Sequence, residues 1–168
     1  FGIESSFVHY ISILSGKPVS QLMGVNTVSS VKTSFSIPIM EVGKVEAFIK
    51  ENNLKRFSVL KVKVNRENAL DFCSEILRLT TVPLRIDANE SFESASETLA
   101  FLEKFPESKI IEFLEQPLPS KFHEEALELK KHAKVILMAD ESVTNEEVNA
   151  YHVERFHAVN VKMMKSGG

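Results

Sequence analysis

The sequence predicts an α/β protein with a parallel sheet, of the (β/α)8 barrel type, of which about six strand–helix units are present. Short β-branched or apolar runs alternate with amphipathic stretches between residues 34 and 162, and such alternation is typical of parallel sheets. Charged residues recur at the ends of these runs, one strand–helix unit apart. No glycine-rich phosphate loop follows the first run, and this disfavours the dinucleotide-binding form of the competing doubly wound sheet.

The elements follow from local pattern and from start and stop signals. A first helix over residues 5–15 should end at Gly16-Lys17-Pro18, because glycine and proline stop helices. The next helices are expected to carry apolar stripes, for example Leu70, Ile76 and Leu77, and Ser91 stands where an N-cap belongs. The predicted strands are 34–39, 58–64, 84–87, 110–115, 135–139 and 158–162, and the predicted helices after the first are 41–52, 66–79, 92–105, 121–132 and 145–155.

Six strands do not close a barrel that requires eight strands and about 250 residues. Six strands by themselves would also leave two long apolar edges open, which is an aggregation hazard. We therefore expect residues 1–168 to be the central part of one barrel domain, which further strands complete.

Composition excludes several classes of protein. The 168 residues carry a formal net charge of −3 with no long block of one sign, which gives no support for nucleic-acid or membrane-surface binding. One cysteine, Cys73, excludes an intrachain disulfide framework, and no apolar run approaches the roughly 20 residues of a membrane span. The composition is typical of a cytoplasmic, soluble α/β protein.

Five charged residues stand at the ends of successive predicted strands. They are Lys63, Asp87, Glu115, Asp140 and Lys162, at intervals of 24, 28, 25 and 22 residues. In a barrel, the carboxyl ends of the strands form the rim on which active sites lie. Three carboxylates that converge there would repel one another unless a divalent cation lay between them. Oxygen ligands favour Mg²⁺ or Ca²⁺, and the sequence has no Cys/His cluster of the kind that binds zinc.

The two lysines of this set suggest acid–base chemistry. Strands two and six of an eight-stranded barrel are diametrically opposed, so Lys63 and Lys162 should face each other across the cation. That arrangement suits removal of a proton from one face of a carbon and delivery to the other. A lysine base requires a pKa below its ordinary value of about 10.4, and nearby cations lower it. Lys61, Lys165 and the metal are the candidates for this effect.

At this point the residues resemble a known family. Lys61-x-Lys63, the three acids on successive strands, and Asn160-x-Lys162 before a Gly-Gly pair resemble the muconate-lactonizing subgroup of the enolase superfamily. Within that subgroup, the segments RIDANES, EFLEQPLP, MADES and NVKMMKSGG are most similar to L-Ala-D/L-Glu epimerases. The similarity runs from about residue 33 to residue 168.

The resemblance implies a mechanism and a cofactor. Asp87, Glu115 and Asp140 would be ligands of Mg²⁺, while Lys63 and Lys162 would transfer protons through a metal-stabilised enediolate, inverting one α-carbon of a dipeptide. Lys61, Lys165 and Asn89 would tune these pKa values or contact the substrate. The resemblance also implies an N-terminal capping domain before this segment, two further strands after it, and a possible homo-oligomer.

Other readings remain open. Cycloisomerisation, N-acylamino-acid racemisation and o-succinylbenzoate formation use the same scaffold, and the residues here hardly separate them. Outside the family, a Schiff-base aldolase barrel would also use a strand lysine but leaves the three acids unexplained. An inactive fragment that acts as a binding module is the third class. The five histidines and Cys73 are interpreted as structural residues.

Overall fold

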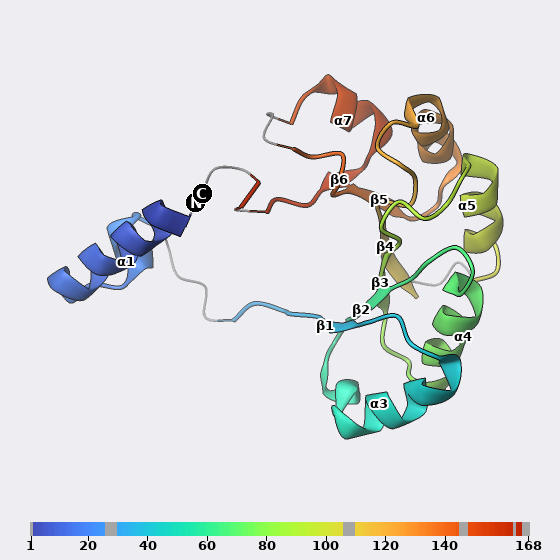
Figure 1. Cartoon of the computed structure of the whole chain (residues 1–168), viewed down its shortest axis with the longest axis horizontal. Coiled ribbons are helices and arrows are strands. Elements are labelled where there is room, and N and C mark those ends of the chain that lie inside the picture. Colours follow the sequence, from blue (N-terminus) through green and yellow to red (C-terminus); the bar gives the residue numbers. More distant parts are fainter. Residues whose placement is uncertain (1, 26–29, 106–109, 145–147, 163, 166–168) are drawn as a thin grey trace. The chain divides into compact units, whose positions relative to one another are not determined.

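The computed structural model describes residues 2–25, 30–105, 110–144, 148–162 and 164–165. The chain divides into two compact units. One comprises Thr33–Val143 and Val148–Asn160 and contains the sheet; the other comprises Phe1–Lys32, Thr144–Glu147 and Val161–Gly168. Figure 1 labels their elements. None of the helices in the described part of the chain is long and apolar enough to cross a membrane.

The larger unit is a six-stranded sheet in which every strand pair is parallel and the strands follow chain order. Figure 1 shows its helices lying along the outer side of the sheet. Its strands are β1 (Phe35–Ile37), β2 (Leu60–Lys63), β3 (Leu84–Asp87), β4 (Ile111–Glu115), β5 (Ile136–Ala139) and β6 (Ala158–Val159). Its helices are α3 (Val45–Glu51), α4 (Ala69–Leu79), α5 (Ala95–Leu102), α6 (His123–His132) and α7 (Ala150–Arg155), with 3-10 turns at Val42–Lys44 and Leu54–Arg56. The predicted α/β class and strand order are confirmed.

The smaller unit contains α1 (Gly2–Ser15) and α2 (Val19–Leu22). Helix α1 ends as expected at Gly16, whose φ of 65° places it in the left-handed region that glycine adopts without a Cβ penalty.

The core lies between the sheet and its helices. On α4 the buried residues are Ala69, Phe72, Cys73 and Ile76, which are spaced as one face of a helix. The predicted stripe was wrong at Leu70, which is 40% exposed. Because the buried face begins at Ala69, the next residue points about 100° away from it.

Two helix starts differ from the prediction. Ser94, not Ser91, caps α5: its side chain accepts a hydrogen bond from the backbone N–H of Glu97. Helix α7 is capped by Asn149, which forms a reciprocal capping box with His152. The predicted start of that helix at Asn145 lies outside the described residues.

Candidate active site at the carboxyl edge of the sheet

Three buried carboxylates mark the carboxyl ends of three neighbouring strands. Asp87 ends β3 and is paired in register with Glu115 at the end of β4, while Asp140 directly follows β5. Their exposed fractions are 2%, 1% and 2%. Glu115 is in register with Met138, so Asp140 lies two residues further along its strand and on the same face. Buried acids are rare unless they are paired, so this edge needs positive charge.

Lys61 supplies such a charge from β2. Its Nζ lies 2.8 Å from Oδ2 of Asp87 and 2.7 Å from Oε2 of Glu115. Burial, the largest single contribution, lowers the pKa of Lys61, but the hydrogen bonds and charges of the two carboxylates together outweigh it, and the pKa is raised. Lys61 is therefore the counter-ion of Asp87 and Glu115 in this structure.

Lys63 lies on the same face of β2, because Leu60 and Val62 alternate with the two lysines and are buried on the other side. Its Nζ is 3.4 Å from Oδ2 of Asp87, and its side chain is 44% exposed. It also donates a hydrogen bond of 2.9 Å to Oδ1 of Asn89. Of the two lysines, Lys63 is the more exposed, at 44% against 20% for the side chain of Lys61.

Asn89 connects this lysine to the loop that follows β5. Its Nδ2 donates to Oε1 of Glu141 at 3.0 Å, and its backbone N–H donates to Oδ1 of Asp87 at 3.3 Å. Its φ of 42° is unusual for a residue with a side chain. The structure thus brings together Lys61, Lys63, Asp87, Asn89 and Glu115.

Two amide residues that sequence reasoning did not assign to the site also hold it. Asn160, which follows β6, donates from Nδ2 to Oε1 of Glu115 at 2.9 Å, so both oxygens of that carboxylate have donors. Gln116 is 1% exposed, and its Oε1 accepts from the backbone N–H groups of Asp140 at 3.0 Å and Ser142 at 3.1 Å. The signal for Gln116 was its position directly after the predicted ligand Glu115, and the signal for Asn160 was its place in the Asn160-x-Lys162 motif.

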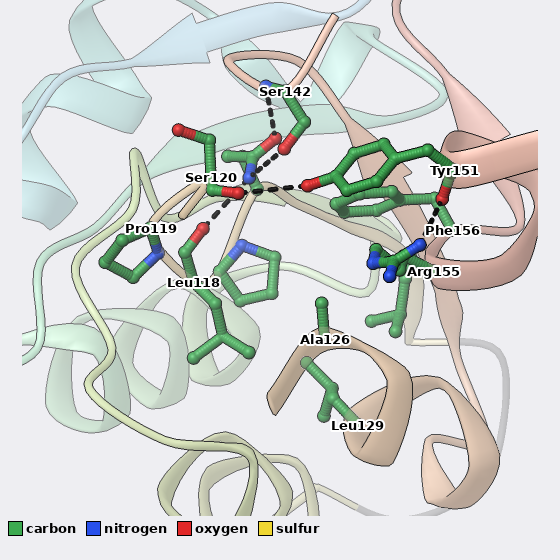
Figure 2. Close-up of a pocket in the computed structure, with 12 residues that line it drawn as sticks. Leu118, Pro119, Ser120, Ala126, Leu129, Ser142, Tyr151, Arg155 and Phe156 are labelled. Atoms are coloured by element: carbon green, nitrogen blue, oxygen red, sulfur yellow. Dashed lines mark hydrogen bonds between the residues drawn. The ribbon is translucent and has the colours of Figure 1, made fainter. Parts of the chain in front are cut away.

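The small cavity next to Gln116 is a packing feature. Figure 2 shows Ser142, Tyr151 and Ser120 around it, with Tyr151 Oη donating to the carbonyl of Ser120 at 3.0 Å. Its volume is about 10 Å³, which is the room that one water molecule needs. No dipeptide fits there.

Lys162 and Lys165 belong to the smaller unit, where the backbone N–H of Lys165 donates to the carbonyl of Lys162 at 2.8 Å. The predicted opposition of Lys63 and Lys162 stays a prediction, because the two lysines lie in different units.

The carboxylates fit a hard cation by their chemistry. Asp87 and Glu115 already converge on one positive charge, the ammonium of Lys61, and carboxylate oxygen is the ligand that Mg²⁺ prefers. As placed in the described residues, no three His, Cys, Asp or Glu side chains surround one point in a metal-binding arrangement. The assignment of Asp87, Glu115 and Asp140 as metal ligands therefore stays a prediction.

The residues interpreted as structural have structural contacts. Cys73 is fully buried, and burial raises the pKa of its thiol to about 12, which suits a packing residue and not a nucleophile. His152 belongs to the cap of α7, with its Nε2 3.0 Å from the carbonyl of Ser142. His157 Nδ1 accepts from the backbone N–H of Leu137 at 3.1 Å.

Comparison with known proteins gives consistent results. Residues 44–168 match the family model described as "Enolase C-terminal domain-like". An L-Ala-D/L-amino acid epimerase of Maribacter sp. is 32% identical over 155 residues, covering 92% of this chain and 44% of that protein. An L-Ala-D/L-Glu epimerase of Bacteroides thetaiotaomicron is 28% identical over 155 residues, covering 92% of this chain and 40% of that protein.

The fold is also similar to that of a solved structure. The muconate lactonizing enzyme from Pseudomonas putida superposes with a TM-score of 0.83 at 22% identity, over 99% of this chain and 48% of that enzyme. At this identity the likeness concerns the fold. The chain spans less than half the length of the curated relatives that it matches.

Proposed function

Because this chain belongs to the enolase C-terminal domain-like family, we propose that the protein is a Mg²⁺-dependent dipeptide epimerase. In this proposal the segment described above is the central part of a barrel that other strands of the protein complete, with a capping domain before it. The enzyme would act in the cytoplasm on a small peptide. The names of the relatives at 28–32% identity support the epimerase class.

One observation of this structure carries the proposal. Lys61 is held between two buried carboxylates, while Lys63, two residues away on the same face, is exposed beside them. Lys63 is the accessible amine of the pair, and a side chain that transfers a proton has to come within reach of the proton that it takes.

The proposed roles follow. Asp87, Glu115 and Asp140 bind the metal, which when bound supplies electrostatic stabilisation of the charge that the substrate carboxylate gains. Neutral Lys63 takes the α-proton, so that the C–H bond breaks and an N–H bond forms. Lys162, in its protonated form, gives a proton to the opposite face of the same carbon. The reverse reaction exchanges these roles, and the two lysines end each cycle with their proton states interchanged.

The substrate class is proposed from the relatives. Both are named for peptides with L-Ala in first position, so we propose L-Ala-L-Xaa peptides, with L-Ala-L-Glu first among them, such as those released in cell-wall turnover.

The test uses the full-length protein. It is incubated in D₂O with Mg²⁺ and a library of L,L-dipeptides, and deuterium uptake is read by mass spectrometry. We expect uptake at one α-carbon and its loss when EDTA removes the metal. Lack of uptake from every dipeptide would contradict the epimerase assignment and favour a cycloisomerase or acyl-amino-acid substrates.

Variants test the lysine roles. Lys63→Ala should lower the rate of epimerisation by about 10³-fold or more, because an acid–base group is lost. Exchange of the α-proton at the face served by Lys162 should survive. Lys55→Ala, at an exposed lysine of the same unit, is the matched control and should keep full activity. Full epimerisation by the Lys63 variant would overturn the assignment.

A further inference from the structure

A continuous hydrogen-bonded chain runs from the exposed lysine to an acid on a different loop. Lys63 Nζ donates to Asn89 Oδ1 at 2.9 Å, and Asn89 Nδ2 donates to Glu141 Oε1 at 3.0 Å. Asn89 therefore lies between a lysine, which in its protonated form can only donate, and a carboxylate oxygen, which can only accept. Such partners define which end of an amide is oxygen and which is nitrogen.

The backbone around Asn89 is held in a costly conformation. Asn89 and Glu90 have φ values of 42° and 62°, and non-glycine residues in this region store strain. The turn is fixed from the neighbouring loop, because the N–H of Glu90 donates to the carbonyl of Gln116 at 2.8 Å. This rigid turn places the backbone of Asn89, but it does not determine how the side-chain amide is rotated.

Glu141 is the acceptor for the amide nitrogen of Asn89. It is partly buried, and among the described residues its Oε2 is a buried oxygen with no hydrogen-bond partner. A carboxylate that is buried with one oxygen unsatisfied is destabilising, and such cases call for a reason outside stability. The contact that the structure gives its other oxygen is the amide of Asn89.

We propose that Glu141 is a positioning residue, which fixes the amide of Asn89 so that Asn89 in turn holds the ammonium or amine of Lys63 toward the substrate. This inference rests on the proposed function of Lys63. The proposed role of Glu141 is to fix the orientation of the Asn89 side chain. Without Glu141 the amide of Asn89 is free to rotate by 180° and present Nδ2, a donor, to Lys63. A donor there cannot hold a protonated lysine.

The proposal predicts a one-sided defect. In the full-length protein, Glu141→Leu should slow the α-proton exchange that Lys63 catalyses by about 10-fold or more, the usual effect of losing a group that orients an active-site residue. Exchange at the opposite face, measured with the other epimer of the same dipeptide in D₂O, should stay within about twofold. Glu141→Gln should restore exchange at both faces, because its amide oxygen accepts from Asn89 as the carboxylate does.

A control separates positioning from general loop order. Glu90→Ala removes a carboxylate of the same turn, whose Oε1 accepts from the backbone N–H of Ser120 at 2.6 Å, and should change both faces equally. An equal loss at both faces in Glu141→Leu, or no loss at either, would overturn the proposal. A drop in Mg²⁺ affinity in Glu141→Gln, measured by calorimetry, would make Glu141 a metal ligand and also overturn it.

Crystal structures of the wild-type protein and Glu141→Leu give a readout that needs no activity. We expect Lys63 Nζ to leave Asn89 Oδ1 in the variant. If that contact persists in the variant, the positioning role is wrong whatever the enzyme does. If it is lost but the wild-type protein exchanges no substrate proton, the positioning role stands and the proposed function fails.

Discussion

Two lysines two residues apart on β2 have different environments. Lys61 contacts Asp87 and Glu115 within 2.8 Å, whereas Lys63 contacts Asp87 at 3.4 Å and is 44% exposed. Burial lowers the pKa of Lys61, but the ion pairs with the two carboxylates outweigh it, and the pKa is raised. This difference supports the proposal that Lys61 is the counter-ion of the two carboxylates and that Lys63 is the lysine that transfers a proton.

Replacement of Lys61 tests the counter-ion role at the residue scale. Lys61→Met in metal-free buffer should lower the free energy of unfolding by about 3 kcal/mol, because it leaves two buried carboxylates without their partner. Since the pKa of Lys61 is raised, its contribution is complete below the ordinary lysine pKa of 10.5 and is lost as pH rises through the raised value. The difference between variant and wild type in urea melts should therefore stay constant from pH 7 to 9.

The matched control is Lys44→Met, because Lys44 forms an exposed pair with Glu41 at 3.0 Å. Exposed pairs contribute about 0–1 kcal/mol. Equal stability of the Lys61 variant and the wild type would contradict the counter-ion role.

The sequence predicted the positions of site residues correctly where those residues stand at the end of a strand. Asp87 and Glu115 were placed by strand spacing, and their register confirms that they are neighbours. The contacts of Gln116 and Asn160 could not be predicted, because each depends on how one side chain is oriented and not on the spacing of the strands. They also depend on turn geometry, such as the φ of 38° at Gln116, that no periodicity encodes.

At the scale of the element, the start of α5 shows how a neighbouring loop overrides a local signal. Ser91 and Ser94 both precede the apolar stretch, and either could cap a helix. However, the N–H of Phe92 donates to the carbonyl of Pro117 at 3.0 Å, so the chain still pairs with the loop after β4 at this point. The helix therefore begins only after Ser94.

This difference predicts opposite results for two identical substitutions. Ser94→Ala should lower the free energy of unfolding by about 1 kcal/mol through loss of the cap. Ser91→Ala should change it little or raise it, because the buried Ser91 Oγ has no hydrogen-bond partner among the described residues. Chemical denaturation of both variants checks this, and an equal loss in the two would show that the cap assignment is wrong.

At the scale of the whole molecule, strand order was predictable and strand length was not. Alternating strands and helices predicted a parallel sheet in chain order, and the six strands confirm it. Of the predicted strand 158–162, only the two residues of β6 form a strand in the structure. β-branched and apolar residues predict that a segment is extended, but they do not predict how many of its residues pair with the neighbouring strand. Consequently the sequence predicted Lys162 on a strand, whereas it follows the strand and belongs to the smaller unit.

The edges of the sheet lead to the prediction for the whole molecule. Within the described residues β1 and β6 each pair with one neighbour, so each presents backbone groups on its other side. If further strands of the protein cover these edges, as we propose, residues 1–168 expressed by themselves should be poorly stable. We expect a broad, weakly cooperative melt by circular dichroism and binding of a hydrophobic dye, whereas the full-length protein should melt sharply. A sharp, concentration-independent transition of the segment would contradict the proposed completion of the barrel.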